Sequence, residues 1–230
     1  MRGAMSNVRI YIGYDKRQPV AYSVCRASIE RRASRPVDIQ PLMLDWMPVK
    51  RRGLTDFSFS RYLVPYLCGY KGRAIFMDPD MIVLDDIHKL MDAASPGYSV
   101  SVVKGSQRFE WSSLMVFDNQ YCEHLTPELV ETGNPQKFDW AHRVGELPKE
   151  WNHCVGYDEP NPNAKLVHFT MGIPVWPETA KCEYSKEWHK EAAMSMGTVS
   201  FQELMGQSVH VPHLSKLNTL SAEKQCLPQT

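Results

Sequence analysis

Short runs of apolar residues, each ending at glycine or a polar residue, recur along the first three quarters of the chain. The sharpest run, 74–77, ends in Asp78-Pro79-Asp80, and a second apolar run, 81–84, follows at once. Apolar runs of this length are typical of buried strands in parallel sheets. Because open α/β sheets bind ligands at the carboxyl ends of their strands, Asp78 and Asp80 are expected at a binding site.

Similar patterns predict the remaining elements. Strands are expected at 8–13, 37–42, 98–103, 114–117 and 165–169. Apolar residues at three- and four-residue spacing predict a helix at 19–29, and further helices are expected at 55–67, 87–91, 121–131 and 183–194. Pro65 and Pro127 are expected to bend or break two of them. The alternation of strands and helices predicts an α/β, Rossmann-like fold with a mostly parallel central sheet and helices on both faces.

The character of the chain changes after Pro177. A further helix is predicted at 199–205, whereas 214–230 is polar and weakly patterned. We therefore expect a main domain over residues 1–177. Residues 178–230 would form a helical or irregular appendage that packs on the core or on a partner.

Composition excludes some classes of protein. Lysine and arginine balance aspartate and glutamate at 26 each, so no basic field indicates a nucleic-acid partner. No run approaches the roughly 18 apolar residues of a transmembrane helix, and no signal peptide is visible. Six scattered cysteines without a Cys-x-x-Cys pair favour reduced thiols. We therefore predict a soluble, cytoplasmic protein.

Asp78 and Asp80 suggest chemistry because two adjacent carboxylates repel each other and stay ionised together only beside a cation. A hard divalent metal that carries substrate phosphates fits such a pair. The alternative is that surface aspartates simply end a strand.

Three other features have both a functional and a structural interpretation. Tyr14 and Asp15 follow the first strand at Gly13, where they could stack on a base and hold a ribose, or form a plain turn. The turn has no Gly-x-Gly-x-x-Gly fingerprint of dinucleotide binding. Arg61 could contact phosphate or sugar, or lie at the surface. His168, at a strand end, could be a ligand or a structural histidine.

Several motifs occur in one order along 8–176: Gly-Tyr-Asp, the helix with Arg61, Phe-Met-Asp-Pro-Asp-Met-Ile-Val-Leu-Asp-Asp, Ser-Ser-Leu-Met-Val-Phe-Asp, Leu-Pro-x-x-Trp-Asn, and His-Phe-Thr-Met-Gly-Ile-Pro-Val-Trp. This order resembles the retaining glycosyltransferases of family 8, the glycogenin and lipopolysaccharide-galactosyltransferase type, which have a GT-A fold with an Asp-x-Asp motif. The resemblance implies a catalytic domain over 1–177. It would transfer a hexose from a UDP-sugar, UDP-glucose or UDP-galactose, to an unknown acceptor hydroxyl.

The resemblance also implies roles for individual residues. Asp78, Asp80 and His168 would bind Mn²⁺, or Mg²⁺, between the two phosphates of the donor. Asp139 would lie near the anomeric carbon as the catalytic residue. The remaining positions implied to bind the donor are Gly13, Tyr14, Asp15, Arg61, Pro79, Ser112 and Gly172.

Two motifs depart from the family pattern. Pro174 occupies the position where the family has a lysine that contacts the diphosphate, and Val175 occupies the position of the proline that follows this lysine in the family. Lys165, Lys181 or Arg61 could compensate for the missing cation. The family's Asn-Ser/Ala-Gly strand start is replaced by Trp111-Ser112-Ser113, which leaves the identity of the donor sugar open.

Two alternatives compete with this hypothesis. A haloacid-dehalogenase-type phosphatase also begins with an apolar run and Asp-x-Asp, but that strand lies near the N-terminus and a Gly-Asp-x-x-x-Asp follows later. Neither feature occurs here. A glycosyltransferase-like module without turnover, serving to bind sugars or as a scaffold, is favoured by the missing lysine. A second copy of the chain is a further possible partner, with which it would form a homodimer.

Overall fold

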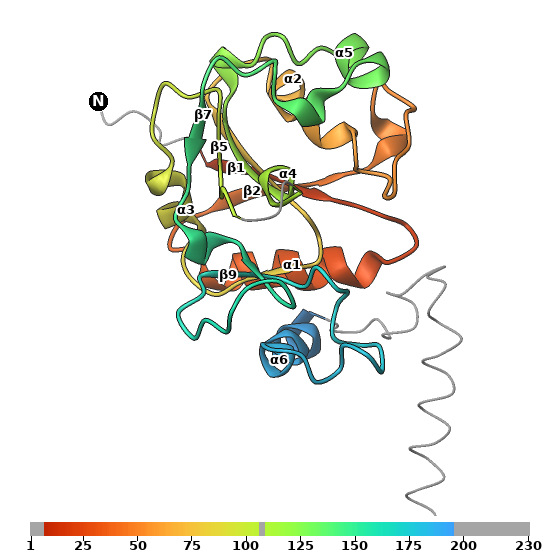
Figure 1. Ribbon diagram of the computed structural model, residues 1–230, viewed down its shortest axis with the longest axis vertical. Helices are drawn as coiled ribbons and strands as arrows, with labels where there is room; N and C mark the ends of the chain where they lie inside the picture. The colour runs from red at the N-terminus through yellow and green to blue at the C-terminus, as the bar shows by residue number, and fades with distance from the viewer. Residues whose placement is uncertain (1–6, 106–108, 196–230) are drawn as a thin grey trace, which may run out of the picture.

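The computed structural model describes residues 7–105 and 109–195. Its centre is a six-stranded sheet with the order β2-β1-β3-β6-β5-β7 (Figure 1). Five strands run in one direction and β6 runs against them. The predicted α/β fold with a mostly parallel sheet is therefore confirmed. The strands are β1 Val8–Gly13, β2 Val37–Leu42, β3 Arg73–Met77, β5 Val100–Val102, β6 Leu114–Asp118 and β7 Val144–Glu146.

A second, three-stranded sheet has the order β4-β9-β8. It consists of β4 Met81–Val83, β8 His153–Cys154 and β9 Leu166–His168. The apolar run after Asp80 thus forms a strand of its own, which lies outside the central sheet. It pairs antiparallel with β9, with Met81 opposite His168. This pairing brings the end of a late strand back to the Asp-x-Asp turn.

Helices cover both faces of the central sheet, and alternate residues of β3 show how the two faces are filled. Ile75 and Met77 belong to one buried cluster with residues of α1 and α3, while Ala74 and Phe76 belong to a second cluster on the opposite face. The helices are α1 Pro19–Arg32, α2 Val64–Leu67, α3 Ile87–Ala93, α4 Glu110–Ser113, α5 Pro127–Thr132 and α6 Ser185–Ser195. Short 3₁₀ turns occur at Leu44–Trp46, Ser60–Leu63, Asn119–Tyr121, Pro135–Lys137 and Lys149–Trp151.

Two predicted helices are shorter than expected, and proline explains both. The region 55–67 holds only the 3₁₀ turn Ser60–Leu63 and α2, whose first turn contains Pro65. In the region 121–131, the helix begins at Pro127, and the Thr126 hydroxyl caps it by accepting from the backbone N–H of Leu129. Proline has no N–H to donate, so it fits the first turn of a helix better than the interior.

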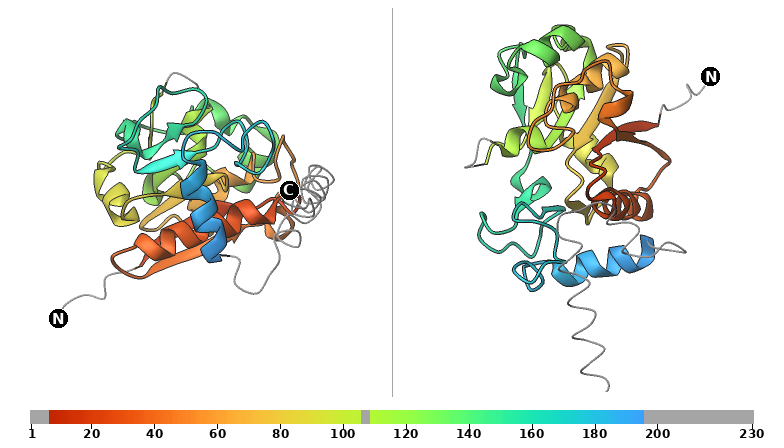
Figure 2. Two further views of the ribbon diagram at one scale, coloured as in Figure 1. Left: turned by 90° about the horizontal axis from the view of Figure 1, so that it is seen from below. Right: turned by 90° about the vertical axis from the view of Figure 1, so that its right-hand side faces the viewer.

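The last described helix, α6, packs against α1 (Figure 2). Glu191 on α6 is 1% exposed and pairs with Arg31 and Arg32 at the end of α1, with 2.8 Å to Arg32 Nη2. The helix predicted at 199–205 and the segment 214–230 lie outside the described residues. Within the described ranges, no helix has the length and apolar character needed to span a bilayer.

Glu191→Gln is expected to lower the free energy of unfolding by about 2–3 kcal/mol, because two charge-assisted hydrogen bonds at a buried carboxylate are weakened. The melting temperature should fall by roughly 4–10 °C. Exposed Glu187, four residues earlier on α6, provides the matched control, Glu187→Gln. Equal melting temperatures for the two variants would show that this ion pair does not hold α6 on the core.

Candidate metal and substrate site

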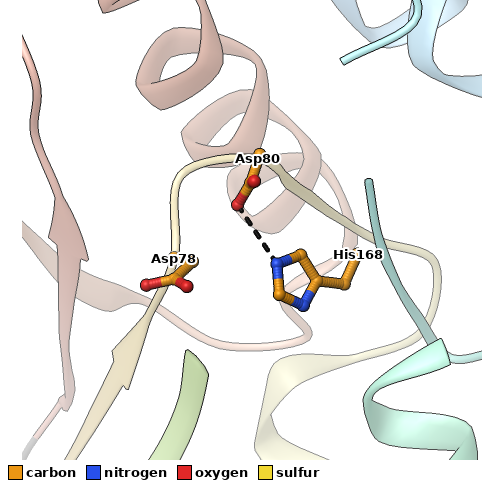
Figure 3. Close-up of side chains that lie close together, drawn as sticks. All are labelled: Asp78, Asp80 and His168. Atoms are coloured by element: carbon orange, nitrogen blue, oxygen red, sulfur yellow. Dashed lines mark ion pairs between the residues drawn. The ribbon is translucent and has the colours of Figure 1, made fainter. Parts of the chain in front are cut away.

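Asp78, Asp80 and His168 converge at the carboxyl end of β3 (Figure 3). One ligand atom from each residue lies within 4.8 Å of the others. Backbone hydrogen bonds fix the turn: Asp78 N donates to Ser113 O at 2.9 Å, and Phe169 N donates to Asp80 O at 2.9 Å. The strand ends that sequence analysis proposed as neighbours are therefore neighbours in space.

Asp78 is held in an unfavourable electrostatic environment. Burial raises its pKa, the guanidinium of Arg61 lowers it, and the charge of Asp80 raises it again, so that the pKa is raised to about 6. Arg61 Nη1 lies 3.0 Å from Asp78 Oδ1. One arginine does not offset the cost of placing two carboxylates together in a buried site.

His168 is almost fully buried, and its ring Nε2 lies 3.4 Å from Asp80 Oδ1. Burial lowers the pKa of the imidazole, but the carboxylate of Asp80 outweighs it and raises the pKa to about 10. The site therefore holds a proton on His168 at neutral pH.

The three side chains fit a hard divalent cation. Asp78 Oδ1 and Asp80 Oδ1 are buried, and neither forms a hydrogen bond of regular geometry within the described part of the chain. Two carboxylates and one imidazole leave positions for phosphate oxygens, which suits Mn²⁺ or Mg²⁺. A cation would supply the positive charge that the proton on His168 now provides.

A cavity of about 400 Å³ opens above these residues. Arg61 lies in its wall, where Nη1 donates to Ser112 O at 2.7 Å and Nε donates to Phe57 O at 3.2 Å. The guanidinium carbon also lies 4.9 Å from the centre of the Phe76 ring. These contacts hold Arg61 beside Asp78 rather than at the open surface. The cavity is lined by Leu54, Thr55, Phe57, Ser58, Arg61, Asp78, Asp80, Phe109, Ser112, Gln136, Tyr157, His168 and Thr170.

Five predicted site residues thus meet at one cavity: Arg61, Asp78, Asp80, Ser112 and His168. Two others lie in the same turns without lining it. Pro79 is buried between the two aspartates, and Gly172 adopts a φ of 108° near the ring of Trp176.

The turn after β1 lies behind the cavity wall. A Cβ on Gly13 would come within 2.6 Å of the Phe57 ring, so glycine lets the 54–61 segment approach the end of β1. Asp15 is buried, and Arg17 Nη2 lies 2.5 Å from its Oδ2 and also donates to Leu54 O. Burial raises the pKa of Asp15, but the bonds from Arg17 outweigh it and lower the pKa. Tyr14 packs edge-on against Tyr22.

The structure places Asp139 away from this cavity. It is exposed and borders a separate hollow with His124, Leu129 and Trp140. The nearby residue that does line the cavity is Gln136.

Among the described residues, no lysine lines the cavity in place of the lysine expected at Pro174. Pro174 itself is buried. Lys165 pairs with Glu150 at 3.1 Å, which leaves Arg61 as the cation that the structure places at the cavity among the three proposed substitutes.

Sequence reasoning missed an aromatic pair on the cavity wall. Phe109 and Tyr157 are 42% and 48% exposed, and their ring centroids lie 5.4 Å apart in an edge-to-face arrangement. Each is close in sequence to a motif that was recognised, Phe109 before Trp111-Ser112-Ser113 and Tyr157 after Trp151-Asn152. Closeness to these motifs was the sequence signal that could have placed the two residues at the cavity, because neither lies in a strand or in a helix with a periodic apolar pattern.

Solved glycosyltransferases share this fold. The galactosyltransferase LgtC, in complex with donor and acceptor sugar analogues, matches with a TM-score of 0.61 and 9% identity, over 87% of this chain and 100% of that chain. GlyE of Streptococcus pneumoniae TIGR4 matches with 0.59 and 13%, over 86% and 63%. The bifunctional glycosyltransferase WbbM matches with 0.59 and 16%. The match covers 94% of this chain but only about half (52%) of WbbM.

These likenesses establish the fold class as that of the GT-A glycosyltransferases. The order of the strands also disagrees with a haloacid-dehalogenase-type phosphatase. In such a phosphatase the strand before Asp-x-Asp lies near the N-terminus, whereas the strand before Asp78 is the third of this chain. No family model matches the sequence. Protein CDI of Arabidopsis thaliana is 32% identical over 223 residues, covering 80% of this chain and 85% of the plant protein. The chain belongs to the same family as Protein CDI.

Proposed function

We propose that the chain is a metal-dependent retaining hexosyltransferase that uses a UDP-sugar, with UDP-glucose or UDP-galactose favoured. The observation that carries the proposal is the convergence of Asp78, Asp80 and His168 on one cavity of a GT-A fold. The base, the sugar and the retention of configuration come from the family-8 resemblance of the motifs. LgtC, which shares the fold, is described with donor and acceptor sugar analogues, and this supports a two-substrate site.

Asp78, Asp80 and His168 would hold the cation, Mn²⁺ or Mg²⁺. When bound, it would act as a Lewis acid on the leaving diphosphate, so that no protein group need protonate it. Arg61 would place a second positive charge beside the same phosphates, because its contacts with Ser112 and Phe57 fix it in the cavity wall. The acceptor hydroxyl would enter through the cavity mouth.

A second candidate is a module that binds nucleotide-sugars without turnover. It is favoured by buried Pro174 at the expected lysine position and by the pairing of Lys165 with Glu150. Donor hydrolysis separates the two candidates, because both would bind UDP with Mn²⁺ but only the enzyme would release free hexose.

Thermal denaturation with a panel of nucleotides and nucleotide-sugars, with and without Mn²⁺, tests the proposal. UDP at about 100 times its Kd should stabilise the folded state by about 2.7 kcal/mol and raise the melting temperature by roughly 5–10 °C. The shift should require Mn²⁺ and should be largest with UDP and one UDP-sugar. A shift with a different nucleotide would overturn the base assignment, and no shift with any would overturn the donor class.

A further inference from the structure

Asn152 connects His168 to helix α4, whose last residue, Ser113, accepts a hydrogen bond from the backbone of Asp78. It follows the 3₁₀ turn Lys149–Trp151 and is 0% exposed. Its side chain contacts His168 at one end and Ser113 and Glu110 at the other. The metal ligands themselves come from other segments, so Asn152 acts behind the site rather than in the cavity.

The hydrogen-bond pattern fixes the orientation of the Asn152 amide. Its Nδ2 lies 3.4 Å from the carbonyl oxygen of Glu110 and 3.1 Å from Ser113 Oγ. Ser113 Oγ in turn donates to the same carbonyl at 2.8 Å, so its proton is already used. Both partners therefore accept from Asn152, which places the amide nitrogen on this side and the amide oxygen toward His168.

The amide oxygen then determines the tautomer of the histidine. Asn152 Oδ1 lies 3.2 Å from His168 Nδ1 and can only accept a hydrogen bond, so Nδ1 is the nitrogen that keeps its proton when the ring loses one to bind a metal. The lone pair is left on Nε2, the ring nitrogen that faces Asp80 and the space between the carboxylates (Figure 3). Partners of this kind commonly orient histidines that bind metals.

The same network reaches Asp78. Ser113, which accepts from the Asn152 amide, uses its carbonyl oxygen to accept from Asp78 N at 2.9 Å. Asn152 therefore holds the end of β9 and the start of β6 at a fixed separation. The Asn152 side chain thus adds a second link between His168 and Asp78 to the one that the pairing of β4 with β9 provides.

We infer that Asn152 is a positioning residue that presents Nε2 of His168 to the divalent cation. The inference rests on the proposed function, because it concerns the same metal site. Loss of such a partner typically weakens metal binding by about 10–100-fold.

Mn²⁺ affinity, measured by isothermal titration calorimetry on the wild type and four variants, provides the test, with Asp78→Asn as the variant that lacks a proposed ligand. Asn152→Leu removes both ends of the amide and should raise the Kd by about 10–100-fold. Asn152→Asp keeps an acceptor for His168 Nδ1 and should bind within about threefold of the wild type or more tightly. Asn119→Leu is the matched control: Asn119 is also 0% exposed, and its Nδ2 donates to Lys71 O at the opposite end of β3. This control should bind as the wild type does.

The outcomes distinguish this inference from the proposed function. If Asn152→Leu binds Mn²⁺ as the wild type does while Asp78→Asn does not bind, the positioning role is wrong and the metal site stands. If the wild type itself shows no saturable Mn²⁺ binding, the metal site fails and the inference fails with it.

If the Asn152 variants do not fold, the inference can still be tested directly on the wild-type protein. Long-range ¹H–¹⁵N correlations in the Mg²⁺-loaded, histidine-labelled protein identify which ring nitrogen of His168 carries the proton. We expect the proton on Nδ1. A proton on Nε2 would overturn the inference.

Discussion

Asp78→Asn is expected to reduce donor hydrolysis and transfer by at least about 10³-fold at saturating Mn²⁺. The substitution removes one of two anionic ligands, and a bound metal contributes several kcal/mol of charge stabilisation, at about 1.36 kcal/mol for each tenfold in rate. The fold should be retained. Because burial raises the pKa of Asp78 to about 6, the ionised carboxylate is a cost to the folded protein at neutral pH, and a neutral amide should not lower the melting temperature.

Asp85→Asn is the matched control for this variant. Asp85 lies in the same acidic stretch but pairs with Lys89 at 2.8 Å and does not line the cavity. It should retain wild-type activity. Full activity in Asp78→Asn, with Mn²⁺ still required, would show that the metal lies elsewhere.

The apparent affinity for Mn²⁺ is expected to rise about tenfold per pH unit between pH 7 and 8.5. The pKa of His168 is raised to about 10, so the ring is protonated throughout this range and must lose its proton before Nε2 can bind a metal. Metal and proton therefore compete, and higher pH favours the metal. Below about pH 6, Asp78 is also protonated, and the slope should approach hundredfold per unit.

Calorimetry in buffers of different ionisation enthalpy measures this effect directly, because one proton should be released for each Mn²⁺ bound near pH 7.5. His168→Gln is the appropriate comparison. This variant should bind Mn²⁺ more weakly than the wild type at pH 8.5, and its Mn²⁺ affinity should not change with pH between 7 and 8.5. A wild-type affinity independent of pH over this interval would contradict the placement of His168 among the ligands.

The sequence pattern was sufficient to predict the strand before Asp78, the late strand that ends at His168 and the α/β class. Each of these rests on a local signal, a short apolar run that ends in a polar residue. Long-range pairing has no such signal. The periodicity of 81–84 could not show that β4 leaves the central sheet to pair with β9, which is what brings His168 to Asp80.

The helix predicted at 55–67 is shorter in the structure because proline and tertiary contacts oppose a continuous helix there. The pattern of apolar residues favoured one continuous helix over 55–67. In the structure a separate short helix, α2, begins at Val64, so that Pro65 lies in its first turn, where no backbone N–H is needed. The segment before it is instead shaped by Phe57, which packs beside Gly13 and whose carbonyl accepts from Arg61. Tertiary contacts of this kind outweigh weak helical propensity.

The candidate site could be predicted only where a motif marked it. Asp78, Asp80 and His168 lie in motifs, and the structure brings them together. Asn152 was part of a recognised motif, yet its role as a partner of His168 requires the fold. Phe109 and Tyr157 lie in irregular segments, where hydrophobic periodicity carries no information about the cavity.

The pairing of β4 with β9 also constrains which changes in length the family can accept. Met81 faces His168 and Val83 faces Leu166, while Asp80 O accepts from Phe169 N one step beyond. Inserting or deleting a single residue within 81–83 or 166–168 would shift this register and turn the next side chain toward the carboxylates in place of the histidine. Relatives should therefore keep these segments at constant length and carry their insertions and deletions in the largely exposed 159–163 connection.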